Sequence, residues 1–396
     1  MNSKIRLMGQ KISRYAVFIL CIIGCIITAG CSDLLTGEGP VIKYAFSSHT
    51  SPTPMPTPLP TQAPTTSSTL TSGTLAPEQS PSLVILATPI EDPTAYHPLR
   101  VIPNSGDAVE YRTFTFRYRT DDYTLRVPMN ASIYRAANTS KNKQMIIDDR
   151  EYGLFYQQVV TDPAMEPFYN DILKEVRNLR YKGGRTLTDD EYLEMVVSFV
   201  QQIPYDITTT GVRYPIEVIY DQKGDCDEKS ILLTGLLSRE GYDVGLLLFP
   251  SLQHATAGIR IHLATNNPSF RVFSDGKRDY IYIETTTTRL IGFYPDEFKT
   301  APQPIIVPVG SGTLNYRHVN YVMSIFYDLG SIKTNTRILE ERAAANNNTL
   351  QQWDYDAHVS YINTYNFVMS TNDREAAMEA IRESELPHQS ACMSCN

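Results

Sequence analysis

Apolar residues recur at helical spacing over two segments in the middle of the chain. Residues 163–179 and 188–200 place them three or four positions apart, which predicts amphipathic helices with one face in the core. The second segment opens on Thr188 with Glu191 three residues later, a capping box, and Pro204 lies just beyond its end. We expect both apolar faces to be core and assign them no chemistry.

Alternating patterns predict strands before and after these helices. Residues 109–134 alternate apolar and polar positions on both sides of a turn expected at 121–122, which indicates a small β element. Residues 244–249 form a continuous apolar run, typical of a buried strand. Residues 279–288 alternate so that the isoleucines face one side and the tyrosines, with Glu284, face the other.

The last part of the chain reads mainly as helices. Residues 319–327 are expected to add a strand. Helical patterns follow at residues 336–345, 361–369 and 372–386. We expect Trp353, the only tryptophan, to anchor this segment to the body.

A glycine, a cysteine and an apolar run follow one another at residues 223–237. The run is spaced as a helix, and Gly241 is well placed to end it. Cys226 would then lie at a helix N-terminus, where unpaired N–H groups and the helix dipole favour thiolate. Its acidic neighbours Asp225, Asp227 and Glu228 favour the protonated thiol instead, and the residues alone leave open which effect is larger.

Cys226 is the one internal cysteine among six. The other five lie near the two ends of the chain: Cys21, Cys25, Cys31, Cys392 and Cys395. A lone internal cysteine with a histidine further on is a nucleophile candidate, and a buried structural cysteine is the alternative. The three neighbouring acids argue against burial in an apolar core.

A thiol that attacks an amide carbon needs a base, and the base needs an orienting carboxylate. His254 and His262 follow Cys226, and Glu284 follows both, so the chain order is cysteine, histidine, acid. His254 has small neighbours that leave room for a substrate. A metal site built from Cys226, Asp225 and His254 is a poor alternative, because zinc sites usually show paired Cys or His ligands.

The N-terminus has the pattern of a secretory signal. Basic residues precede an apolar stretch at residues 16–29, and Ala-Gly-Cys31 resembles a lipobox, in which Cys31 is lipidated. Thr28 stands where an aliphatic residue is usual, so an uncleaved signal anchor is the competing interpretation. Residues 32–82 contain a Pro/Ser/Thr-rich linker. Both interpretations place the body on the outer face of the cytoplasmic membrane.

The net charge of −8 speaks against a nucleic-acid partner. The sequence gives no indication of a cofactor. The tail pair Cys392 and Cys395 is spaced as CxxC, but it lies at a free end without a βαβ context. A disulfide or a second attachment point is therefore favoured over redox chemistry.

Several segments together resemble the transglutaminase-like superfamily, in particular extracytoplasmic prokaryotic and archaeal members. They cover residues 187–298 in the order of that family: 199–205, 213–217, 224–233 with Cys226, 254–259 with His254, 282–286 with Glu284, and 291–297. The resemblance implies an α+β, papain-like fold, in which the cysteine helix packs on an antiparallel sheet. A small N-terminal β element and C-terminal helices would complete it.

The resemblance also implies roles for the residues. Cys226 would be the nucleophile, His254 the general base and acid, and Glu284 the orienting carboxylate, where most of the superfamily has aspartate. The Cys226 N–H would hold the oxyanion, with Gln201 as a further donor; a plain core position is the alternative for Gln201.

We accordingly divide the chain into five segments. They are a signal or anchor (1–31), a linker (32–82), a β-rich element (83–160), a transglutaminase-like core (161–330) and a helical segment with the CxxC tail (331–396).

The leading hypothesis for function is a surface-tethered thiol enzyme acting on amide bonds of proteins, peptides or envelope polymers. It would work through an acyl-enzyme, with hydrolysis favoured over transamidation because water is the default acceptor. The alternative is an inactive domain that binds or assembles at the cell surface.

Overall fold

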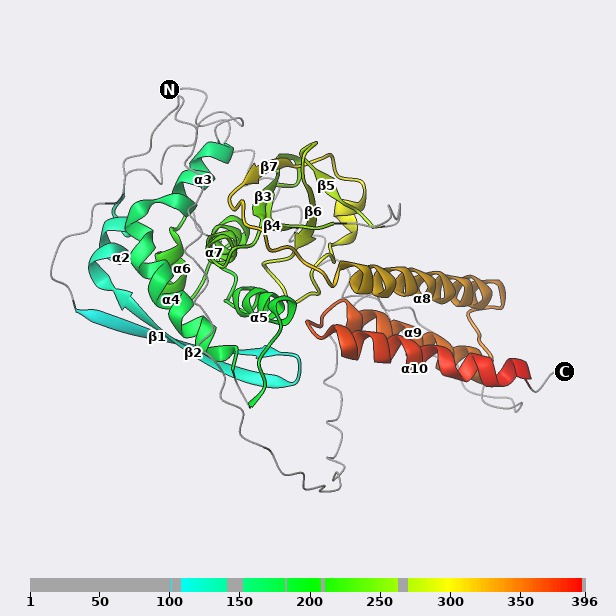
Figure 1. Cartoon of the computed structure of the whole chain (residues 1–396). Coiled ribbons are helices and arrows are strands. Elements are labelled where there is room, and N and C mark those ends of the chain that lie inside the picture. Colours follow the sequence, from blue (N-terminus) through cyan, green and yellow to red (C-terminus); the bar gives the residue numbers. More distant parts are fainter. Residues whose placement is uncertain are drawn as a thin grey trace, which may run out of the picture. The chain divides into compact units, whose positions relative to one another are not determined.

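The computed structural model describes residue 101 and residues 108–140, 152–181, 184–207, 211–262 and 270–393. All of these residues belong to one compact unit. It is an α+β fold with helices, a curled antiparallel sheet and a separate two-stranded hairpin (Figure 1). The expected α+β class is confirmed, and its assignment as papain-like stays a prediction. The predicted N-terminal signal, Cys31 and the linker lie outside the described residues.

The hairpin consists of β1 (Val109–Tyr118) and β2 (Asp121–Asn130), which pair antiparallel. The predicted strands are therefore confirmed, but the turn expected at 121–122 is wrong. It lies at Arg119 and Thr120, and the two aspartates already begin β2. Arg119 takes the left-handed backbone conformation, with φ at 55°, that so short a connection requires.

The strand expected to continue to residue 134 ends at Asn130. Its side-chain oxygen accepts hydrogen bonds from the N–H groups of Ser132 and Ile133, which makes it the N-cap of α2 (Ala131–Asn138). This capping asparagine is the local signal that the alternating pattern obscured.

Four more helices follow α2 before the cysteine in the described part of the chain. They are α3 (Tyr152–Thr161), α4 (Glu166–Leu179) after a short 3₁₀ turn, α5 (Asp189–Gln201) and α6 (Pro215–Asp221). The capping box of α5 is confirmed, because Thr188 and Glu191 each bond the other's backbone N–H. Every residue of α5 after the first is buried, so this helix is central rather than half-exposed.

The cysteine helix α7 (Cys226–Arg239) lies against the sheet. Gly241, with φ at 85°, follows its end as predicted. The sheet order is β5-β6-β4-β3-β7 and all its neighbours are antiparallel. Its strands are β3 (Val244–Phe249), β4 (His254–Arg260), β5 (Phe273–Ser274), β6 (Asp279–Ile283) and β7 (Ile305–Pro308). Within the sheet, helix α7 packs mostly on β4 and also on β3, and helices α5, α6 and α3 contact it as well (Figure 1).

The two faces of the sheet belong to different hydrophobic clusters. Ile281 and Ile283 join the main core, which also contains the apolar residues of α5 and α7. Tyr280 and Tyr282 join a second, aromatic cluster with Phe249 and others. The predicted alternation along β6 is thus confirmed, and it gives the tyrosines a separate environment.

Three helices end the described chain. They are α8 (Val319–Ala345), α9 (Gln352–Val368) and α10 (Arg374–Met393), and they pack side by side (Figure 1). The strand expected at 319–327 is wrong, because these residues are the first turns of α8. The buried residues Val319, Val322 and Met323 have helical spacing, which the β-branched and aromatic composition concealed.

The role expected for Trp353 is also wrong. Its side chain is 59% exposed and therefore does not bury itself in the body. Arg374 makes that connection instead, since its Nε donates to Glu194 of α5 at 2.9 Å.

Candidate active site

Cys226 is the first residue of α7 and is partly exposed. The turn before it is fixed by a capping box, in which Asp225 accepts from the Glu228 N–H and the Glu228 side chain accepts from the Asp225 N–H. A chain that enters a helix through this turn holds the thiol at the helix N-terminus, as the sequence predicts.

Burial, reinforced by the acidic neighbours, sets the state of the Cys226 thiol. Burial, followed by the charge of Asp227, raises the pKa of Cys226 to about 12, and a backbone hydrogen bond with Ala255 only partly opposes this rise. The Cys226 Sγ lies 4.0 Å from Asp227 Oδ1. Burial and a hydrogen bond to Asp227 also raise the pKa of Asp225, to about 9. The thiol is therefore protonated at neutral pH.

His254 is the first residue of β4 and precedes Ala255, whose backbone is hydrogen-bonded to the Cys226 thiol. Its Nε2 lies 3.0 Å from the hydroxyl of Tyr282, and its ring stands edge-on to Phe298 with centroids 5.1 Å apart. Burial lowers the pKa of His254 below its usual 6.5, while the charge of Glu284 opposes that effect. The imidazole is consequently neutral at pH 7.

Glu284 follows β6 and is 2% exposed. One carboxylate oxygen accepts from Thr285 N–H, Thr286 N–H and the Thr286 hydroxyl at 3.0, 2.8 and 2.6 Å. The other accepts from the Tyr282 hydroxyl at 2.9 Å. Burial alone would raise the pKa of Glu284, but the bonds from Thr286 lower it on balance, so the group is a carboxylate.

The structure brings the imidazole and the carboxylate together through Tyr282. In this part of the described chain the two are joined by the phenol and not by a direct hydrogen bond. Sequence reasoning missed this residue, although the alternation that put Tyr282 and Glu284 on one face of β6 was the available signal.

Ser230 ties together the three segments that carry these groups. Its hydroxyl is buried and lies 2.5 Å from the Cys226 carbonyl, 3.3 Å from the Ala255 carbonyl and 3.0 Å from the Thr285 hydroxyl. Ala255 follows His254, and Thr285 follows the acid. One side chain of α7 therefore fixes the helix, β4 and the end of β6 against one another.

Gln201 is buried at the end of α5, beside the loop that follows the acid. Its Nε2 donates to the carbonyls of Glu284 and Arg289, each at 2.9 Å, and its Oε1 accepts from the Arg289 N–H. Both amide hydrogens are thus already used to hold the loop.

Lys229 lies under the cysteine, one turn further along α7, and is 0% exposed. Its Nζ donates to the carbonyls of Gln201 and Ile203 at 3.1 and 2.7 Å. Burial lowers its pKa to about 8, against the favourable charge of Glu284. The ammonium satisfies carbonyls at the C-terminus of α5 and so joins the two central helices.

The alternative base, His262, lies beyond β4 and is exposed. Cys392 and Cys395 lie outside the residues whose side chains are described. Within the described ranges no group of three His, Cys, Asp or Glu side chains could hold a metal ion. No described helix is both long and apolar enough to span a bilayer.

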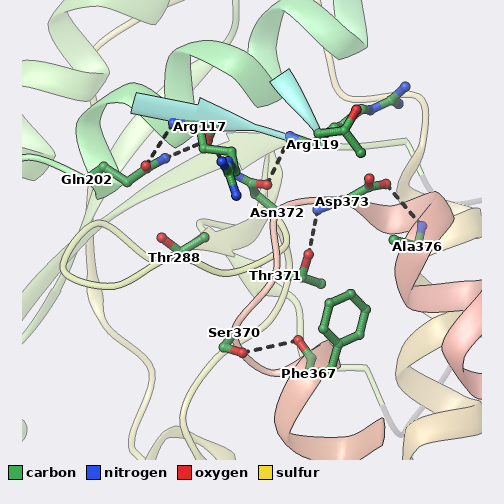
Figure 2. A pocket seen from close by; sticks show the side chains of 11 residues that line it. Arg117, Arg119, Gln202, Thr288, Phe367, Ser370, Thr371, Asn372, Asp373 and Ala376 are labelled. Carbon is green, nitrogen blue, oxygen red and sulfur yellow. Dashed lines mark hydrogen bonds between the residues drawn. The ribbon is translucent and has the colours of Figure 1, made fainter. Parts of the chain in front are cut away.

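A pocket of about 320 Å³ lies away from these residues, between the hairpin turn, the end of α5 and the α9–α10 connection. Figure 2 shows Asn372 bridging the hairpin: its Oδ1 accepts from Arg119 N–H at 3.2 Å and its Nδ2 donates to the Arg117 carbonyl at 2.8 Å. Neither Cys226 nor His254 lines it. We interpret it as a gap in a structural junction.

No family model and no curated protein matches this sequence. Two solved structures, both of LapG from Legionella pneumophila, are partly similar. The calcium-bound form matches 38% of this chain and 97% of its own, with 14% identity and a TM-score of 0.21. The EGTA-treated form matches 43% and 90%, with 14% identity and a TM-score of 0.23. Scores this low carry no argument about activity, which therefore depends on the site's own geometry.

Proposed function

We propose that this chain is a transglutaminase-like thiol enzyme that acts on amide bonds, with Cys226 as nucleophile, His254 as base and Glu284 as orienting acid. The observation that supports the proposal is the Ser230 hydroxyl, which joins the backbone of Cys226 to the residues next to the other two. The states of the three groups also support it, since Cys226 is partly exposed, His254 is neutral and Glu284 is a carboxylate.

The resting state favours general-base chemistry over a thiolate–imidazolium pair. As the Cys226 sulfur bonds to the amide carbon, its proton passes to His254. The imidazolium then gives this proton to the leaving amine nitrogen, the C–N bond breaks, and a thioester remains. Water that loses a proton to the same imidazole attacks the thioester, and the thiol recovers that proton as the acid leaves.

The oxyanion of the tetrahedral intermediate needs hydrogen-bond donors. The N–H of Cys226 is our first candidate, because the first N–H groups of a helix have no partner inside it. Gln201 would contribute only after releasing the carbonyl of Glu284 or Arg289, to which it is bonded at rest.

We further propose that residues 1–31 tether the enzyme to the outer face of the cytoplasmic membrane, through lipidated Cys31 or an uncleaved anchor, with the linker as a stalk. Substrates would be proteins, peptides or envelope polymers. The order of segments in the sequence supports this part of the proposal.

The second candidate is a binding module that keeps the fold without the chemistry. The observation in its favour is the pKa of about 12 for Cys226, which makes the free thiol a weak nucleophile.

The test is cleavage of a peptide library by the full-length protein, with products identified by mass spectrometry. We expect cleavage by the wild type and a loss on the order of 10⁴-fold or more in Cys226→Ser and His254→Ala. Ser238→Ala is the matched control, because Ser238 is a buried serine of α7 that bonds only within its helix.

Hydroxylamine added during turnover should trap the acyl-enzyme as a peptide hydroxamate, since it competes with water for the thioester. Incorporation of a primary amine at a comparable rate would instead favour transamidation. If the wild type and all variants retain peptides equally and cleave none, the proposed enzymatic activity is contradicted and the binding module is supported.

A further inference from the structure

The phenol of Tyr282 is the one group bonded to both His254 and Glu284 in the described structure. Its oxygen lies 3.0 Å from His254 Nε2 and 2.9 Å from Glu284 Oε2. The residue is 0% exposed. A buried hydroxyl can be there merely to satisfy the carboxylate, so its role depends on how firmly it is held and in which direction the hydrogens point.

The ring of Tyr282 is held by other aromatic side chains. Phe298, Tyr294 and Phe249 surround it, with ring centroids 5.3, 6.3 and 6.5 Å away. Phe298 also packs edge-on against the imidazole of His254, at 5.1 Å. A shared neighbour therefore fixes both rings, and the phenol oxygen has little freedom to leave its place between base and acid.

The direction of the hydrogen bonds follows from counting hydrogens. A carboxylate only accepts, so the single hydrogen of the phenol points to Glu284. The Thr256 hydroxyl also lies against the phenol, but its single hydrogen is donated to the Ile283 carbonyl. The phenol oxygen therefore accepts from the imidazole, which requires the hydrogen of neutral His254 to be on Nε2. The other ring nitrogen, Nδ1, is consequently bare, as a base for the Cys226 thiol has to be.

We propose that Tyr282 is a positioning residue through which Glu284 selects the tautomer of His254. Glu284 thus acts on His254 indirectly, through the phenol of Tyr282 that is hydrogen-bonded to both. This inference rests on the proposed function for its catalytic consequence, whereas the tautomer itself exists in the resting protein.

Other charged groups lie near the hydrogen bonds that join His254, Tyr282 and Glu284 but form none of them. Asp227 and Glu297 act on His254 by charge alone, and Arg289 acts on Tyr282 in the same way. Only Glu284 faces the phenol as a bonded carboxylate. A change of tautomer on altering Glu284 can therefore be attributed to the hydrogen-bond chain.

Glu284→Gln is the decisive variant, because it should reverse the direction of the hydrogen bonds between residue 284, Tyr282 and His254. Oε1 of the amide would keep the donors that now come from Thr285 and Thr286, so the amide nitrogen would face Tyr282. The phenol oxygen would accept from that nitrogen and donate its own hydrogen to His254 Nε2. The imidazole hydrogen would then move to Nδ1 and block the base.

The experiment records long-range ¹H–¹⁵N spectra of the histidine rings in the full-length protein at pH 8, where His254 is neutral. His254→Ala identifies the signals. We expect Nε2–H in the wild type, Nδ1–H in Glu284→Gln and a mixture in Tyr282→Phe. The matched control is Tyr280→Phe, which removes a buried phenol on the same face of β6 that bonds Asp243 instead; it should keep the wild-type tautomer.

In peptide hydrolysis we expect kcat to fall on the order of 10³–10⁴-fold in Glu284→Gln, because the tautomer is wrong, with KM nearly unchanged. Tyr282→Phe should lose about 10- to 100-fold, as variants of orienting partners commonly do. If Tyr282 had only a structural role, Tyr282→Phe would lower the stability of the protein and leave both the His254 tautomer and kcat unchanged.

The outcomes separate the two proposals. Wild-type Nδ1–H, or one tautomer in all variants, would overturn the inference even if the protein hydrolyses peptides. The expected tautomers in a protein without hydrolysis would sustain the inference and remove the proposed function. If Tyr282→Phe does not fold, Glu284→Gln decides alone, since it leaves the aromatic cluster intact.

Discussion

Among single residues, Asp227 has the largest charge effect on the reactivity of Cys226. A helix N-terminus favours thiolate, but burial and this carboxylate raise the thiol pKa to about 12. The Tyr156 hydroxyl donates to Asp227 at 2.8 Å and helps keep the acid in place. The free protein should therefore react slowly with alkylating reagents at neutral pH.

Asp227→Asn should make the thiol more reactive. Because a negative charge beside Cys226 disfavours thiolate, its removal lowers the pKa, and alkylation by iodoacetamide at pH 8 should become roughly tenfold faster. The rate is followed by intact-mass spectrometry from pH 6 to 10. Asp221→Asn, on α6, is the control. An unchanged pH dependence would mean that burial alone sets the pKa.

The sequence was sufficient to select Cys226, His254 and Glu284 as candidates, because their chemistry and order are visible in it. Their mutual distances were not available from spacing. Tyr282 and Ser230 were missed for the same reason: a phenol and a hydroxyl acquire a role only when folding brings partners from three segments to them.

Among the secondary-structure elements, the first turns of α7 hold the site together. Ser230 lies one turn beyond Cys226 and reaches both β4 and the residue after Glu284. Boundaries with a strong local signal were predicted well, such as the capping box of α5. The start of α8 was not, because a run of β-branched and aromatic residues suits a strand as well as a helix.

Ser230→Ala should loosen this arrangement without unfolding the protein. We expect peptide hydrolysis to fall about tenfold and the free energy of unfolding to fall by about 1 kcal/mol, the usual value of one buried hydrogen bond. Hydrolysis and urea unfolding are measured beside Ser238→Ala. Equal activity in the two variants would show that the link to β4 and the acid loop is dispensable.

Across the whole molecule, a buried carboxylate connects the central helix α5 to segments that lie far before and far after it in the sequence. Glu194 of α5 accepts from the hydroxyls of Tyr118 and Tyr316, from His318 and from Arg374, at 2.8 to 3.2 Å. Burial alone would raise the pKa of Glu194, but these partners, His318 first, lower it. None of this was predictable, because the partners are scattered along the sequence.

Arg374→Met should destabilise the protein by about 3 kcal/mol, because it leaves a buried charge short of a partner. The fold lowers the pKa of Glu194, so the ionised carboxylate stabilises the folded protein. This part of the free energy of unfolding is fully present above the ordinary pKa of 4.5 and is lost as the pH falls below it. The urea midpoint at pH 7 measures the effect. Arg382→Met on the exposed side of α10 should leave the midpoint unchanged; a similar loss in both would contradict the buried connection.

The limits of the five segments predicted from the sequence stay predictions. The described structure has the hairpin, the sheet and the last three helices in one compact unit, and Tyr118 of the hairpin and Arg374 of α10 meet at Glu194. Composition marks a linker clearly, but it cannot mark a boundary inside a packed unit, where contacts cross in both directions.

The buried amine of Lys229 gives this protein a built-in reporter of local opening. Acylating reagents reach an amine only where solvent does, and this one is enclosed between α5 and α7 with both carbonyl partners in place. Its modification in the native protein therefore has to wait until the two helices separate. The rate of that modification therefore measures how often the core beneath Cys226 opens locally. Mass spectrometry can follow it without a label or a known substrate.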